Sequence, residues 1–524
     1  MNDTSLFAFE FPRIGGLMAT HYFPYFIGIA LVTLTTYTWA TSNPSLKKLP
    51  HINPPGFFSN AQSKHDFRRL AKTMIQKARK HFPNQPYRMT TDFGEVVMLQ
   101  SEWFQEIRNN PHLSFIGTIA EERICEIPGF EPLATLGEDG MLVQIIATKQ
   151  LTRSINQVTE PLSEEIALSL SINMGESTDW HEIQIMPALR DVTARMSSRV
   201  FLGKELARSA EWLEITTNYT NITMMALAKL TNYYPAIRPY VGRFFPESRR
   251  VQTYYKRARA LIDPVMEKRA ALKRAAIEAG QPEPIYNDAL EWIAKESKEH
   301  NFKCDVANFQ LMISVVAIST TSDLLQCTLI NLIKHPETMQ AARDEIAHVL
   351  KTEGWRKTSL YSMKLLDSIL KESQRIKPFF SAMRRAVEED ITLADGTLIK
   401  KGSRIHIDTH RMVDPEVYEN PEEWKGSRFL DLRSQPGKEH VAQLVTTSVD
   451  HIGFGHGKHA CPGRFFAANE LKIALCHLLL KYDWKLAPGT PTDDVNMGFS
   501  QRVNPFTKVL CRRRTSMEVD IDSI

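Results

Sequence analysis

One cysteine near the C-terminus stands in a setting that suits a metal ligand. Residues 451–472 read HIGFGHGKHACPGRFFAANELK, so Cys461 closes a glycine-rich loop and precedes a helical pattern. Glycine has no Cβ, which lets the loop backbone lie flat against a planar ligand. The amide end of the following helix favours a negatively charged sulfur beside it. The stretch therefore predicts a thiolate that is an axial ligand for haem iron.

Two other interpretations of this loop stay open. Imidazole and thiolate are both zinc ligands, and the loop offers His451, His456, His459 and Cys461. A structural zinc site normally draws its ligands from two loops, whereas these four residues come from one short run. The remaining alternative is a buried free cysteine on an ordinary loop. Partner motifs elsewhere in the chain decide between the three.

The loop carries the fixed spacing of a known motif. Its pattern resembles the cysteine-ligand loop of the cytochrome P-450 superfamily in Phe454, Gly457, Cys461 and Gly463. The resemblance implies a haem b cofactor (iron protoporphyrin IX) whose iron is bound by Cys461. It also implies that Phe454, Gly455 and Gly463 belong to the cofactor site.

The haem of this family carries two propionates, which need cationic or donor partners. Arginine suits a carboxylate because its fork geometry allows two parallel hydrogen bonds. The resemblance places His459 and Arg385 as such partners, and the neighbouring Arg384 points the opposite way if this segment is a strand. For the early-helix arginine of the family, the candidates are Lys149 and Arg153.

A second motif lies in LLDSILKESQRIKPFF, which has the pattern of an amphipathic helix. Glu372 and Arg375 stand three residues apart on one face of it. The pair resembles the family's Glu-x-x-Arg signature, whose third member is an arginine in a proline-bounded segment, here Arg428. Buried charges must be paired to be tolerated, so we interpret this triad as structural.

A third motif is expected on the other face of the haem. Residues 309–337, FQLMISVVAISTTSDLLQCTLINLIKHPE, form a long apolar segment with a polar interruption. If this were an ordinary core helix, its hydroxyls would simply bond to carbonyls one turn earlier. It resembles the oxygen-activation helix of the family, with Ala317 and Thr320 at the small-residue and threonine positions. Ser319 stands where the family usually has an acid. A hydroxyl relays a proton but cannot supply one as a carboxylic acid does.

Composition agrees with a large enzyme. The chain has 524 residues, 43% of them hydrophobic, and a formal net charge of +4, which does not indicate nucleic-acid binding. Its six cysteines have no disulfide-framework spacing. The predicted fold class is mainly α with a small β region, as a single large cytochrome P-450 fold. We expect a lumenal tail and transmembrane helix over residues 1–46, a proline-rich linker over 47–60 and the haem-thiolate monooxygenase domain over 61–524.

The N-terminal segment predicts membrane attachment. No Lys, Arg, Asp or Glu occurs from Ile14 to Leu46, which exceeds the roughly 20 residues needed to cross a bilayer. Lys47 and Lys48 follow directly, so the positive-inside rule places the tail in the lumen and the catalytic region in the cytosol. We therefore expect a single-pass protein of the endoplasmic reticulum membrane.

The exact residues of the motifs narrow the expected function. AISTTSDLL and FGHGKHACPGRFFA are similar to fungal microsomal monooxygenases of secondary metabolism. This implies that the enzyme uses dioxygen and NADPH-cytochrome P-450 reductase and acts on an apolar terpenoid, meroterpenoid or indole diterpenoid. The candidates for the substrate pocket are Val316, Ala317, Phe379, Phe380 and Phe499. The alternatives are a haem-thiolate isomerase or dehydratase, against which Thr320 argues, and a zinc-binding membrane adaptor without catalytic activity.

Overall fold

The structure, a computed structural model, describes residues 25, 28–29, 32–33, 44–56, 59–135, 140–377 and 381–524. The chain divides into two compact units, Met1–Leu49 and Pro50–Ile524. Most of the predicted tail and membrane anchor lies outside the described residues, and the first unit contributes a short helix, α2 (Pro44–Lys47). The boundary between the units falls inside the predicted linker, 47–60.

The second unit is mainly helical, in agreement with the expected fold class. Its long helices are α3 (Ala61–His81), α8 (Thr152–Met174), α9 (Ile185–Ala207), α10 (Ala210–Leu230), α12 (Pro246–Glu278), α13 (Ala289–Glu299), α14 (Val306–Lys334), α15 (Pro336–Glu353), α17 (Lys364–Ile376) and α20 (Arg464–Lys481). Shorter helices are α4 (Phe104–Ile107), α5 (Phe115–Ala120), α7 (Gly140–Ile145), α11 (Arg238–Val241), α16 (Lys357–Ser362), α18 (Arg428–Arg433) and α19 (Glu439–Ala442).

A five-stranded sheet forms the main β region. Its strands pair in the order β1 (Tyr87–Thr91), β2 (Gly94–Leu99), β8 (Arg404–Asp408), β5 (Ser381–Val387) and β3 (Leu113–Ser114). Only β2 and β8 pair in parallel. A register shift interrupts the β5–β8 pairing between Ala382 and Arg385, where Met383 has a φ of 53°. Such a bulge re-aims the side chains that follow it.

Smaller sheets complete the β structure of the described residues. One has three strands, β4 (His181–Gln184), β12 (Lys508–Arg513) and β9 (Tyr482–Leu486). Two hairpins pair β10 (Val495–Met497) with β11 (Ser500–Arg502) and β6 (Ile391–Thr392) with β7 (Leu398–Ile399). The segment 391–408 therefore contains the β6–β7 hairpin followed by β8.

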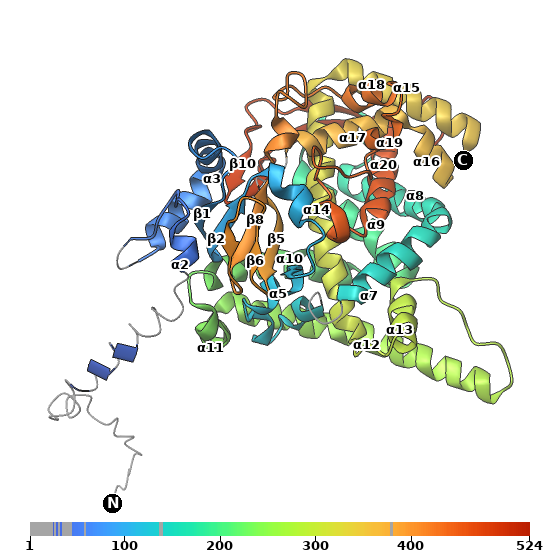
Figure 1. The fold of residues 1–524 in the computed structure, drawn as a ribbon. Helices are drawn as coiled ribbons and strands as arrows, with labels where there is room; N and C mark the ends of the chain where they lie inside the picture. Colours follow the sequence, from blue (N-terminus) through green and yellow to red (C-terminus); the bar gives the residue numbers. More distant parts are fainter. Residues whose placement is uncertain are drawn as a thin grey trace, which may run out of the picture. The chain divides into compact units, whose positions relative to one another are not determined.

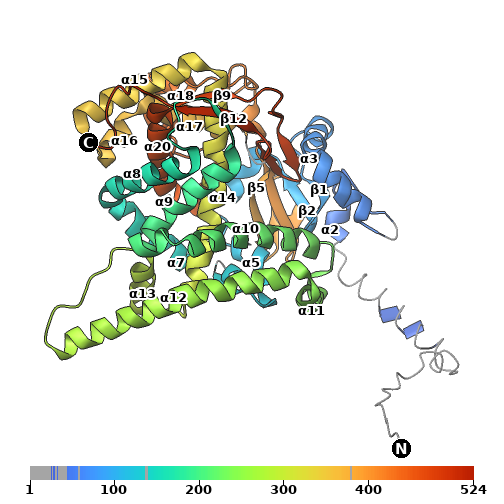
Figure 2. The ribbon, with the colours of Figure 1, turned by 180° about the vertical axis from the view of Figure 1, so that it is seen from behind.

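Helix α14 is the central element of the second unit. It begins where the Asp305 side chain accepts a hydrogen bond from the Asn308 amide, and Pro336 opens the next helix after it ends. Figures 1 and 2 show α14 running between the five-stranded sheet and helices α8, α9 and α20. In the part of the chain that the structure describes, α14 alone is long and apolar enough to cross a membrane, but 67% of its apolar window is buried inside the protein. It is a core helix here.

One buried carboxylate holds three separate elements together beside the sheet. Glu122 is 4% exposed and forms an ion pair with Arg238 of α11, which is also buried. Its Oε1 lies 3.1 Å from Arg384 of β5 and 2.6 Å from Arg404 of β8. A buried carboxylate is tolerated when it is paired in this way.

Candidate active site

The loop before α20 is shaped by glycines. Gly455 and Gly457 have φ angles of +68° and +79°, a region that residues with a Cβ rarely adopt. A Cβ on Gly457 would also lie 2.9 Å from the Cβ of Arg108. The loop closes where the Cys461 amide donates a 2.7 Å hydrogen bond to the Phe454 carbonyl. This geometry sets Cys461 at the start of α20.

Opposing electrostatic effects act on the half-buried Cys461 thiol. Burial raises its pKa, whereas hydrogen bonds from the backbone amides of Gly463 and Arg464 and the charge of the Arg464 guanidinium lower it. Amides at a helix start favour a thiolate. A metal ion bound to the sulfur would remove the thiol proton outright. Burial is the largest of these effects and keeps the pKa of the thiol above its ordinary value, so a thiolate here depends on a bound metal ion.

A strip of α14 is uncovered although the helix lies in the core. Val316 is 41% exposed and Thr320, one turn later, is also exposed, whereas the flanking Val315 and Ile318 are buried. The hydroxyls of Thr320 and Ser319 donate to the carbonyls of the residues four earlier, at 2.8 Å and 3.1 Å. Ala317 is half-buried on the same strip. A flat apolar ligand could lie against it.

Among the described residues, Arg385 and His459 have no carboxylate partner. Arg385 is 4% exposed, and burial alone lowers its pKa to about 10. Its NH1 donates to the Arg384 carbonyl at 2.7 Å, while within the described ranges no hydrogen-bond partner meets its buried Nε. Burial and then the charge of Arg385 lower the pKa of His459. Arg384, by contrast, pairs with Glu122.

These features fit a haem. Cys461 offers the iron ligand, the strip of α14 offers an uncovered apolar surface, and Arg385 is a buried guanidinium that a propionate would neutralise. A Cβ on Gly463, two residues after the cysteine, would meet nothing within 4 Å. The residues therefore leave open space beside the thiol.

The zinc interpretation is not supported by the placement of the histidines. His451 is buried with its Nε2 3.2 Å from the Lys371 carbonyl. His456 contacts Arg108 through Nε2 at 2.7 Å and the Thr447 hydroxyl through Nδ1 at 2.9 Å. Among the described residues, the one group of three potential metal ligands is Glu296, Glu299 and His300, far from Cys461 in the sequence. Zinc binding at the loop is thus disfavoured.

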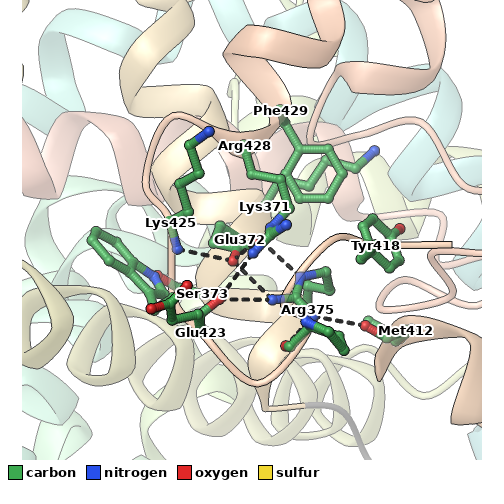
Figure 3. Close-up of polar contacts among 12 residues, drawn as sticks. Lys371, Glu372, Ser373, Arg375, Met412, Tyr418, Glu423, Lys425, Arg428 and Phe429 are labelled. Atoms are coloured by element: carbon green, nitrogen blue, oxygen red, sulfur yellow. Dashed lines mark hydrogen bonds and ion pairs between the residues drawn. The ribbon is translucent and has the colours of Figure 1, made fainter. Parts of the chain in front are cut away.

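The Glu372, Arg375 and Arg428 side chains form a buried network (Figure 3). Arg375 donates two 2.8 Å hydrogen bonds to Glu372, and Arg428 donates one of 3.0 Å to Oε1 of the same carboxylate. Arg375 also donates to the carbonyls of Met412 and Pro421, at 2.9 Å and 2.8 Å. The network therefore ties α17 to the segment that leads toward the cysteine loop.

Lys371, which precedes Glu372 of the triad, was not predicted from the sequence as a functional residue. It is fully buried and donates to three carbonyls, those of Val441, Gln443 and Thr446, at 2.8, 2.6 and 3.0 Å. Burial lowers its pKa to about 7. The one signal in the sequence was a lysine next to the Glu-x-x-Arg glutamate.

The other predicted residues are placed as follows. Phe499 packs edge-on against Phe67, with 4.8 Å between ring centroids, and stacks on His406 at 5.0 Å, so it lies near α3 and the sheet. Phe379 and Phe380 lie outside the described residues. Lys149 pairs with Glu296 at 2.8 Å, so this propionate candidate already has a carboxylate partner. Phe454 is half-buried against the main hydrophobic core.

The chain resembles known proteins over most of its length. A family model described as cytochrome P-450 matches residues 137–509. The chain belongs to the cytochrome P-450 family. Similar proteins include the cytochrome P-450 monooxygenases hepE of Aspergillus oryzae, 43% identical over 90% of this chain and 87% of that protein, and eqxH of Fusarium heterosporum, 41% identical over 91% and 93%. TRI1 of Fusarium sporotrichioides is 38% identical over 90% and 87%.

The fold agrees with a solved cytochrome P-450 structure. Retinoic acid-bound cyanobacterial CYP120A1 matches with a TM-score of 0.61 and 17% identity, over 84% of this chain and 94% of that one. The predicted family and enzyme class are therefore confirmed: the chain is a cytochrome P-450 monooxygenase, an oxidoreductase. Its family implies a haem, dioxygen and an electron-donating partner. Bound haem supplies dioxygen activation, which the thiolate ligand promotes.

Proposed function

We propose that this cytochrome P-450 binds haem b and oxidises an apolar polycyclic secondary metabolite, of the terpenoid, meroterpenoid or indole diterpenoid class. The observation that carries the proposal is the uncovered strip of α14, where Val316 offers an apolar surface and Thr320 a hydroxyl. The high identity to fungal monooxygenases supports the same class of reaction.

Each residue has a defined role in this proposal. Cys461 binds the iron, and Arg385 with His459 neutralises the propionates. Thr320 and Ser319 accept and pass protons near the reacting atoms. Their own hydroxyl protons point back to carbonyls, so the lone pairs of their oxygens remain to accept a proton. Val316 and Ala317 exclude water and orient the substrate. The triad of Glu372, Arg375 and Arg428 holds the fold around the cysteine loop.

The proposal includes a membrane setting. The uncharged segment from Ile14 to Leu46 anchors the chain in the endoplasmic reticulum membrane, with the catalytic unit facing the cytosol. Electrons come from NADPH-cytochrome P-450 reductase, one at a time. An apolar substrate then reaches the enzyme from the lipid.

A spectrum and a product assay test the proposal. The reduced, carbon monoxide-bound protein should show the red-shifted band of a thiolate-ligated haem, and Cys461→Ser should remove it. Membranes containing the chain and reductase are then incubated with terpenoid hydrocarbons and steroids under ¹⁸O₂. A product labelled with one ¹⁸O atom supports monooxygenation. A product formed without NADPH and dioxygen would favour the isomerase or dehydratase alternative.

A further inference from the structure

Gln374 is a residue of α17 that belongs to neither the triad nor the carbonyl contacts of Lys371. It lies between Glu372 and Arg375 in the sequence and is half-buried. Its Oε1 is covered by protein and accepts no hydrogen bond from any residue that the structure describes. A covered amide oxygen without a partner costs free energy, so hydrogen bonding does not explain why this side chain lies where it does.

The Gln374 side chain packs directly against Gly453 of the cysteine loop. A Cβ built on Gly453 would lie 2.3 Å from both Cδ and Oε1 of Gln374 and 2.6 Å from its Cγ. These distances are far inside van der Waals contact. Gly453, unlike Gly455 and Gly457, does not have a positive φ. Glycine is therefore needed at 453 for space, and Gln374 is what occupies that space.

Gly453 is the second residue of a tight turn. The Gly455 amide closes the turn by donating a 2.8 Å hydrogen bond to the carbonyl of Ile452, which is buried. The carbonyl of the third residue, Phe454, accepts the 2.7 Å hydrogen bond from the Cys461 amide. A contact that fixes Gly453 therefore fixes Cys461 one hydrogen bond further on.

Helix α17 gives Gln374 a rigid base. The hydroxyl of the preceding Ser373 accepts a 3.1 Å hydrogen bond from the Trp424 indole, and the following Arg375 is held by Glu372 (Figure 3). Ser373 and Arg375 are both fully buried. The base of the side chain cannot shift without breaking these contacts, so Gln374 leaves the loop only by changing rotamer.

We propose that Gln374 is a positioning residue for the iron ligand: it packs on Gly453, fixes the turn 452–455 and thereby sets the position of Cys461. The backbone amides of Gly463 and Arg464 donate to the cysteine sulfur, and these bonds depend on where the cysteine lies. Hydrogen bonds to a ligating sulfur control how much charge it donates to iron. The inference rests on the proposed binding of haem iron by Cys461.

Two substitutions test the contact in the haem-loaded full-length protein. Gly453→Ala adds the Cβ that Gln374 excludes, and Gln374→Ala in the same chain vacates the space for it. In the reduced, carbon monoxide-bound Gly453→Ala protein, the thiolate band should fall relative to the blue-shifted band of haem without its thiolate, by about fivefold, as for two coupled residues in contact. The double variant should recover most of the wild-type ratio. A wild-type ratio in Gly453→Ala, or no recovery in the double variant, overturns the proposal.

The midpoint reduction potential of the haem separates positioning from a merely structural role. Gln374→Ala should move the potential to a more negative value, because weaker amide hydrogen bonds leave more charge on the sulfur. Gln374→Met keeps the length of the side chain without its amide and should retain the wild-type potential, since the role needs packing only. Gln340→Ala, at an exposed position of α15, is the matched control and should change neither band nor potential. A Gln374→Ala protein with the wild-type potential overturns the proposal, whatever its stability.

The same spectra distinguish this inference from the proposed function. A wild-type protein without a thiolate band overturns the assignment of Cys461 and with it the proposed function. A wild-type protein with that band, and variants that do not differ from it, uphold the function and overturn the inference alone. If Gly453→Ala fails to bind haem, the potentials of Gln374→Ala and Gln374→Met still decide.

Discussion

Arg385 is a guanidinium buried without a counter-ion in the described part of the chain, although its neighbour Arg384 has one in Glu122. The difference follows from their alternation in β5 after the bulge at Met383. An unpaired buried charge destabilises a protein unless a ligand neutralises it. Arg385 should therefore destabilise the fold when haem is absent and stabilise it when haem is bound.

Replacing Arg385 by Leu should move two measurements in opposite directions. The apoprotein should gain stability, on the order of 1 kcal/mol, because an unpaired charge leaves the interior. The haem-loaded protein should lose haem faster, because a propionate partner is gone. Denaturant unfolding of the apoprotein and haem transfer to an acceptor protein measure the two effects. A variant that retains haem as well as wild type contradicts the propionate assignment.

Thr320 makes a local prediction of a different kind. Among the described residues, its hydroxyl bonds to the Val316 carbonyl alone, so Thr320→Ala should change the free energy of unfolding by no more than about 0.5 kcal/mol. Product formed per NADPH should nevertheless fall about tenfold, since a proton relay is lost. Thr321→Ala, on the buried side of the same helix, is the control. It should reduce stability and leave coupling intact.

At the scale of elements, α17 positions the cysteine loop from a distance. Glu372 accepts hydrogen bonds from Arg375 and Arg428, while Lys371 binds three carbonyls of the segment 441–446. Arg464, three residues after Cys461, donates to the Val445 carbonyl at 3.0 Å and to that of Cys461 at 2.7 Å. The loop geometry therefore depends on charges of α17 that do not contact the thiol.

Removing Arg428 should expose this dependence. Arg428→Ala leaves Glu372 with one cation fewer in a buried site, and the expected cost is about 3 kcal/mol. Thermal unfolding measures the cost, and the thiolate band of the carbon monoxide complex should weaken together with it. Lys425→Ala is the control, because Lys425 reaches Glu372 only through its backbone amide. A stable Arg428→Ala protein with a full thiolate band would refute a structural triad.

Contacts between side chains at a fixed spacing can be predicted from the sequence, whereas contacts with main-chain carbonyls or with residues far along the chain cannot. Glu372 and Arg375 were predictable because an i, i+3 spacing on a helix brings side chains together. The same holds for the spacing of Phe454 and Cys461, which one loop determines. The partners of Lys371 are main-chain carbonyls, which every residue carries, so residue type gives no sign of them. Glu122 joins elements more than 100 positions apart, which periodicity cannot indicate.

At the scale of the molecule, the division after Leu49 separates the segment that we propose as a membrane anchor from the second unit. A chain that begins at Pro50 should therefore fold and keep the thiolate band of the carbon monoxide complex. The full chain should sediment with membranes and resist extraction by alkaline carbonate, whereas the shortened chain should not. A shortened chain that sediments equally well would contradict anchoring by the N-terminal segment, and loss of the band would show that the catalytic unit needs it.

Glu122 has a consequence for how this sequence can diverge. Its single negative charge is shared by Arg238, Arg384 and Arg404, which come from α11 and two strands of the main sheet. A neutral residue at 122 would take this carboxylate from three neighbouring guanidiniums, of which, in the described part of the chain, Arg404 alone keeps an ion pair with another acid, Glu121. Such a change is tolerable only after at least one arginine has already gone. The four positions should therefore vary together among related chains, and the order of substitutions should matter.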